Sequence, residues 1–284
     1  MFATIGRSWQ LVKASLAFLR TNKSFVMFPI LSGIATIIAA VVLLLPASIV
    51  AGIFNAATDS TSSSGDSTSI VGLVLLFLFY VVMYTISIYF NVALTGAILK
   101  ELEGVDVNVG YGLSVANKKM GKIIQYAAVS ATVGIILEQL KEKGGWLGNI
   151  VSMLGGFTWS LVTFFVVPLM VVEDKGVFDL IKDSGSLLKN TFGEQIAGGA
   201  GVGLITTIAS VGLIVVCTVL GSIFQSGGMW LLVGIIGAVG FVFIILLGSM
   251  LSAVYKVMVF RWAQTGEVPG GMDESLLKAA FKSK

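Results

Sequence analysis

Histidine is absent from this 284-residue chain, and charged residues make up only 12% of it. Without histidine, the usual zinc sites and the Ser-His-Asp triad cannot form. The single cysteine, Cys217, excludes an intrachain disulfide. The sequence contains no Walker loop and no dinucleotide fingerprint, and no carboxylate pair lies inside an apolar run. We therefore expect a protein that is not an enzyme and that holds no metal or other cofactor.

Apolar residues dominate instead, at 56% of the chain with a mean hydropathy of +0.97. A water-soluble core cannot use this much apolar surface. Six runs contain no Lys, Arg, Asp or Glu: 25–54, 70–99, 123–137, 146–172, 196–224 and 229–255. A membrane span needs about 20 residues, so the run at 123–137 must borrow Gly121, Lys122 and Glu138 at the interfaces. We predict one all-α integral membrane domain over residues 1–284, a polytopic membrane protein with six transmembrane helices as three hairpins.

The basic residues predict the orientation. If the six runs are spans, 16 of the 18 lysines and arginines fall on one side. Positive residues concentrate in cytoplasmic loops. We therefore expect both termini in the cytoplasm, and we expect the polar, low-complexity segment 55–69 to be a flexible extracytoplasmic loop. The net charge of +3 indicates anionic lipid rather than nucleic acid.

Amphipathic segments occur on the predicted cytoplasmic side. We expect an interfacial helix within residues 1–22, a second at 177–188, a less regular one at 112–122, and a tail helix within 262–284. Basic side chains on or near these segments are candidate contacts for lipid headgroups: Arg7, Lys13, Arg20, Lys118, Lys119, Lys182 and Lys189.

The order of amphipathic helix, outgoing span and returning span recurs three times, as a weak internal repeat. Gly104, Gly176 and Gly266 each follow a returning span. Small residues also form stripes inside the last two spans, including Thr206 and Cys217 in one and Gly237 and Gly248 in the other. Such stripes favour close helix packing.

Polar side chains recur on three of the predicted spans. If their faces converge, they could line a groove for a lipid headgroup or a small polar solute; hydrogen bonds that hold the bundle together explain them as well. In either case we expect Tyr84, Asn91, Gln125 and Thr163 to be mostly buried. The candidate groove residues are Tyr80, Tyr84, Ser87, Asn91, Gln125, Trp159 and Thr163.

Several local motifs also resemble a known family. They are Ser8-Trp9-x-Leu11-x-Lys13-x-Ser15, Phe28-Pro29, and Trp159 followed by 164–169, 181–184 and 191–193. These segments resemble a family of prokaryotic multi-pass membrane proteins of unknown function and, more distantly, the membrane portion of some glycerophosphodiester phosphodiesterases. The resemblance implies a location in the cytoplasmic (inner) membrane and transfers no active site.

The leading interpretation is a non-enzymatic membrane protein that engages anionic lipid and scaffolds partners or organises the bilayer, alone or as a homo-oligomer. The alternative is a passive transporter or channel for a small or lipid-like molecule, and an enzyme acting on lipid ranks third. The uncharged spans argue against an ion-coupled carrier, because such carriers place ionisable residues within the bilayer.

Overall fold

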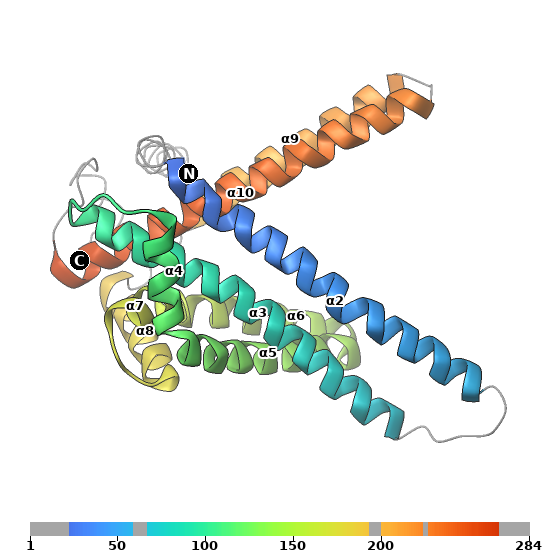
Figure 1. The fold of residues 1–284 in the computed structure, drawn as a ribbon, viewed down its shortest axis with the longest axis horizontal. Coiled ribbons are helices and arrows are strands. Elements are labelled where there is room, and N and C mark those ends of the chain that lie inside the picture. Colours follow the sequence, from blue (N-terminus) through green and yellow to red (C-terminus); the bar gives the residue numbers. More distant parts are fainter. Residues whose placement is uncertain (1–22, 59–66, 193–199, 224–226, 267–284) are drawn as a thin grey trace. The chain divides into compact units, whose positions relative to one another are not determined.

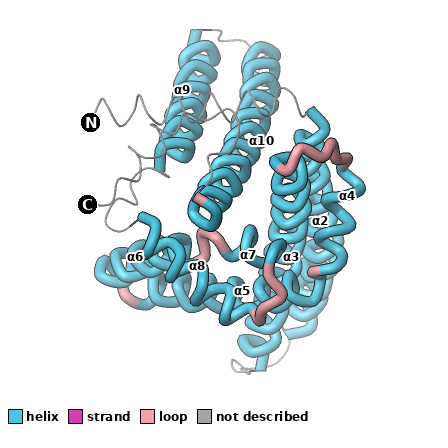
Figure 2. The backbone as a smooth tube through the Cα atoms, turned by 90° about the vertical axis from the view of Figure 1, so that its left-hand side faces the viewer, coloured by secondary structure: helices cyan, strands magenta, loops and turns pink. Residues whose placement is uncertain are grey.

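The computed structural model describes residues 23–58, 67–192, 200–223 and 227–266. Within these ranges the chain forms helices and loops and no strand (Figure 2). The interfacial helix predicted within residues 1–22 lies outside the described ranges, as does the tail from residue 267 onward. The elements are η1 (Lys23–Val26), α2 (Met27–Thr58), α3 (Ser67–Leu102), α4 (Val109–Lys118), α5 (Met120–Lys143), α6 (Gly145–Val162), α7 (Val166–Val172), α8 (Val177–Phe192), α9 (Ala200–Ile223) and α10 (Gly227–Thr265) (Figure 1).

Among the described residues, five helical stretches are long and apolar enough to cross a membrane: Ser24–Leu43, Val74–Leu102, Met120–Lys143, Gly145–Val172 and Leu232–Thr265. A shorter apolar helix, Thr206–Ser222, lies within α9. Within the described residues, each predicted run is therefore mostly helix, with an interruption at residues 163–165 of the fourth. The arrangement of all six as three hairpins stays a prediction.

Several predicted boundaries were wrong. Helices α2 and α3 extend into the loop expected at 55–69, which narrows the segment that can be loop. Helix α10 continues to Thr265, so the start of the predicted tail helix belongs to it. The amphipathic segment expected at 112–122 ends at Lys118, because a new helix begins at Met120. Apolar periodicity continues past an interface, so it locates the middle of a helix better than its ends.

Glycine ends two of the returning helices. Gly104 adopts a φ of 81° and Gly266 a φ of 69°. The amide of Gly104 donates to the Glu101 carbonyl, and the amide of Val105 to that of Lys100, which is a Schellman motif. Gly176 does not share this backbone conformation, and its carbonyl accepts the Leu180 amide at the start of α8. The repeat of exit glycines therefore holds at two positions of three.

The described residues divide into two compact units. The first contains the described parts of 1–29, 97–108 and 186–284, and the second contains 109–185 with the described parts of 30–96. In the first, large buried side chains come from η1, the start of α2 and the end of α10: Phe25, Phe28, Met250, Met258 and Phe260. In the second, they come from α5, α7 and α8: Ile123, Met170 and Leu180.

Candidate functional site

A cluster of hydroxyl groups forms in the second unit from α3, α5 and the residue that follows α6. Tyr126 of α5 is buried, and its hydroxyl lies near those of Ser130, on its own helix, and Thr163, directly after α6. The Thr163 hydroxyl itself donates to the Trp159 carbonyl at 2.7 Å. Tyr84 of α3 lies against α5, because a Cβ placed on Gly134 would be 3.4 Å from the Tyr84 hydroxyl oxygen. Two of the predicted groove residues, Tyr84 and Thr163, therefore reach the same cluster.

The remaining groove candidates do not converge on it. Tyr80 stacks on Tyr84 with ring centroids 6.3 Å apart but is itself exposed. Ser87 is exposed and Trp159 is half-buried. The expectation that Asn91 is buried was wrong, since the side chain is exposed and its amide donates to the Ser87 carbonyl of the same helix at 2.8 Å.

Gln125 was also expected to be buried, and it is exposed. The next residue, Tyr126, takes the inward position together with Ser130, one helical turn later. Ala127 and Ala131 flank them and are fully buried. On the buried face of α5, Tyr126 is followed by Ser130 and Ala127 by Ala131, each one helical turn later. This spacing indicates the buried face better than the polarity of Gln125 does.

The fourth apolar run is long and apolar enough to cross a membrane, but its helix is interrupted between α6 and α7. Pro168 has no N–H to donate to the Phe164 carbonyl, and its ring crowds that carbonyl. The chain tightens instead: the Phe164 amide donates to Leu161 and the Val166 amide to Thr163, both three residues back. Residues 163–165 therefore separate the two helices.

Ser184 of α8 satisfies the amide that this break releases. The Phe165 N–H donates to Ser184 Oγ at 2.9 Å, and both residues are fully buried. A buried amide without a partner would cost about 1–3 kcal/mol. Val162 meets Gly185 beside this bond, where an added Cβ would lie 3.5 Å from Val162 Cγ1. Helix α8 is therefore anchored to the interruption by its buried side.

Charged groups connect the start of α5 to the loop between α7 and α8. Lys122 Nζ lies 2.5 Å from Asp174 Oδ1, and Lys119 Nζ lies 3.7 Å from the same oxygen. Lys119 also donates to the Glu173 carbonyl at 3.1 Å. Hydrogen bonding to Lys122 and the two positive charges hold the pKa of Asp174 below its usual range. The carboxylate is therefore ionised at physiological pH.

A second group of charges lies next to the first. Lys175 Nζ is 2.7 Å from Asp183 Oδ2 and 2.9 Å from Glu173 Oε2. The hydrogen bond to Asp183 and the nearby carboxylate of Glu173 raise the pKa of Lys175 above its usual value. Lys175 thus pairs with the carboxylates of Glu173 and Asp183, and Asp174 is the carboxylate that pairs with Lys119 and Lys122.

The predicted headgroup contacts have different surroundings. Lys118, Lys182 and Lys189 are exposed, whereas Lys119 is half-buried and already bonded to the loop. The other three lie outside the described ranges: Arg7, Lys13 and Arg20.

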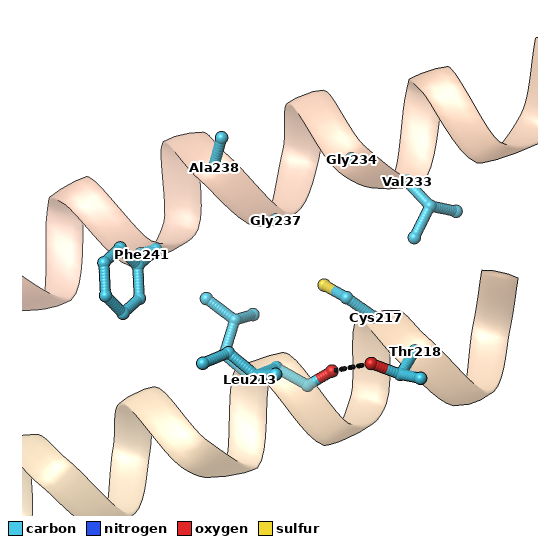
Figure 3. A pocket seen from close by; sticks show the side chains of 9 residues that line it. Leu213, Cys217, Thr218, Val233, Gly234, Gly237, Ala238 and Phe241 are labelled. Atoms are coloured by element: carbon cyan, nitrogen blue, oxygen red, sulfur yellow. Dashed lines mark hydrogen bonds between the residues drawn. The ribbon is translucent and has the colours of Figure 1, made fainter.

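Two cavities are lined by residues that do not belong to the hydroxyl cluster. A groove of about 330 Å³ lies between α9 and α10, where Leu213, Cys217 and Thr218 face Val233 and Phe241 (Figure 3). The Thr218 hydroxyl donates to its own helix at Ile214, so the groove offers little free polarity. A second of about 490 Å³ lies at the end of α5, beside Gln139 and Lys143.

Within the described ranges, no group of three or more Cys, Asp or Glu side chains is placed to hold a metal ion. Searches of curated proteins and of solved structures found no match. A family profile does match residues 70–270, which include α3 to α10 and both the hydroxyl cluster and the charged junction. The chain belongs to the family of unknown function DUF6159.

Proposed function

We propose that this protein is a non-enzymatic, multi-pass protein of a prokaryotic cytoplasmic membrane, which engages anionic lipid from the cytoplasmic side and scaffolds partners or organises the bilayer. The distribution of lysine and arginine supports this orientation. The surface of α8 supports the engagement with lipid.

Helix α8 separates its side chains by type. Leu180, Ser184 and Leu188 are buried. Phe178, Lys182 and Lys189 follow one another at i, i+4 and i+11, which places them on a common stripe of the helix. Phe178 is 75% exposed and both lysines are exposed. An aromatic ring followed by two cations fits the boundary between headgroups and acyl chains, and this stripe is the observation that carries the proposal.

Charge removal on this stripe tests the proposal. Each Lys near an anionic surface contributes about 1 kcal/mol, so Lys182→Gln with Lys189→Gln should weaken lipid contact by about 2 kcal/mol. Hydrogen exchange of residues 177–188 should respond to phosphatidylglycerol in wild-type nanodiscs and should respond much less in the double variant.

The matched control replaces two lysines in the last turn of α5, in the double variant Lys141→Gln with Lys143→Gln. That variant should keep the wild-type response of α8 to phosphatidylglycerol. Identical exchange of 177–188 in neutral and anionic nanodiscs would refute the role of the stripe.

Sidedness has a separate test. In a background with Cys217→Ser, a cysteine at Ser63 should react with an impermeant thiol reagent applied to intact cells, and a cysteine at Ser275 should react only after lysis. Labelling of Ser275→Cys from outside would contradict the orientation.

The interrupted α6–α7 segment beside the Tyr126 cluster favours a second candidate, a passive transporter, because transporters often build sites at broken helices. Solute flux into liposomes should then disappear in Tyr126→Phe with Thr163→Val. It should persist in Asn91→Leu, since the Asn91 side chain lies outside the cluster. A lack of flux in the wild type would favour the scaffold.

A further inference from the structure

In the ion pairs between the start of α5 and Asp174, the lysine side chains are much more buried than the carboxylate. The side chains of Lys119 and Lys122 are only 18% and 21% exposed, whereas that of Asp174 is 90% exposed. The two cations are therefore fixed by packing along their stems, and the anion approaches them from the solvent side. In this arrangement the cations form the built part of a site, and the carboxylate is its exchangeable occupant.

One carboxylate does not saturate the two lysines. Both ammonium groups use the same oxygen, at 2.5 Å for Lys122 and 3.7 Å for Lys119. The first turn of α5 contains no acidic residue, and Lys118 adds an exposed positive charge one residue before Lys119. The neighbouring carboxylates of Glu173 and Asp183 are bound to Lys175. Among these groups, the four lysines Lys118, Lys119, Lys122 and Lys175 face three carboxylates, so one positive charge is in excess.

We infer that Lys119 and Lys122 form a binding site for a phosphate group, which Asp174 occupies as an internal competitor until a phosphate displaces it. A phosphate presents several oxygens, so each lysine can take one of its own, whereas a single Asp174 oxygen serves both now. An anionic lipid headgroup and a free phosphate ion share this chemistry. The phosphate site rests on the proposed function only in one respect, the supply of anionic lipid from the cytoplasmic leaflet. Its residues are separate from the stripe on α8.

Displacement of Asp174 also changes the loop that precedes α8. Residues 173–176 connect α7 to α8, and the bonds to Lys119 and Lys122 tie the start of this loop to α5. When phosphate binds the two lysines, the ion pairs of Asp174 are broken. The loop is then held to Lys119 only by the hydrogen bond to the Glu173 carbonyl. Phosphate binding should therefore be visible as faster amide exchange in 174–176.

The experiment uses the full-length protein in phosphatidylcholine nanodiscs, with either phosphatidylglycerol in the bilayer or inorganic phosphate in the buffer. Hydrogen exchange of 174–176 is followed as each is increased. A response to phosphatidylglycerol alone identifies a lipid headgroup as the ligand, and a response to both identifies the phosphate group itself. No response to either overturns the inference.

Asp174→Asn removes the competitor, so the midpoint of the phosphatidylglycerol titration, followed by retained lipid in native mass spectrometry, should fall about two- to fivefold, as expected for loss of an exposed ion pair. Asp179→Asn makes the same charge change at an exposed position and should leave the midpoint near the wild-type value. Equal shifts in both variants would mean that only net charge matters, which also overturns the inference.

If Asp174→Asn does not fold, Lys122→Gln supplies the test, because it should abolish the response of residues 174–176 that the wild type shows. Lys182→Gln with Lys189→Gln should leave the loop response intact, which separates this site from failure of the α8 stripe.

Discussion

Close packing of α9 on α10 leads to a quantitative prediction for Gly248→Ala. A Cβ on Gly248 would lie 2.6 Å from both Oγ1 and Cγ2 of Thr206 and 3.2 Å from its Cβ. Rotation about χ1 cannot clear the space, because it exchanges one γ atom for another. The helices must instead move apart by about 1 Å to restore ordinary contact.

The energetic terms oppose each other. Alanine improves helix propensity by about 1 kcal/mol over glycine, whereas overpacking costs about 1–3 kcal/mol. Gly234→Ala on the same helix gains the first term without the second, since nothing lies within 4 Å of its added Cβ. Gly248→Ala should therefore be less stable than Gly234→Ala by about 1–3 kcal/mol.

Cys217 supplies the assay, because it is the only cysteine in the chain and lies opposite Gly237 of α10 (Figure 3). Its alkylation by a membrane-permeant maleimide is measured across a titration with denaturing detergent. Gly248→Ala should shift the midpoint to lower detergent, and adding Thr206→Ala should restore most of the loss by removing both γ atoms. Coincident midpoints for Gly248→Ala and Gly234→Ala would refute the packing argument.

Two further predictions concern α8 and the loop before it. Ser184→Ala should destabilise the protein by about 1–3 kcal/mol, because it removes the hydroxyl that accepts from the buried Phe165 amide. Ser186→Ala, at an exposed position, should be nearly neutral. Thermal unfolding in detergent compares the two variants, and equal melting temperatures would contradict the role of the Ser184 hydroxyl. Because the pKa of Asp174 is lowered in the folded protein, its contribution is present above the unfolded pKa and is lost only as pH falls through the folded value. Exchange of 174–176, corrected for intrinsic rates, should thus stay constant from about pH 5 to pH 9 and rise only below about pH 4; a transition near neutral pH would be inconsistent with this pairing.

Sequence patterns predicted the helices well because membrane spans leave a strong local signal. Within the described residues, each run without charge is mostly helix. The stripes of small residues predicted close approach, which the contacts of Gly237 with Cys217 and of Gly248 with Thr206 confirm. These features depend on residues within one helix or on one shared face.

The candidate site was less predictable, because it depends on which face of each helix turns inward. Polarity favoured Gln125, but Tyr126 is buried, with its hydroxyl near those of Ser130 and Thr163. The pairing of Phe165 with Ser184 joins residues 19 positions apart, and no periodicity within either helix encodes it. Pro168 lies at the break within one helix, yet the residue that completes the break lies on another helix.

The bond between Phe165 and Ser184 also has a consequence for how α8 opens. The donor belongs to residue 165 and the acceptor to residue 184, so the bond forms only when α8 has folded back on the segment between α6 and α7. Movement of α8 away from that segment breaks the bond. Opening of α8 and faster exchange of the Phe165 amide should therefore occur as one event.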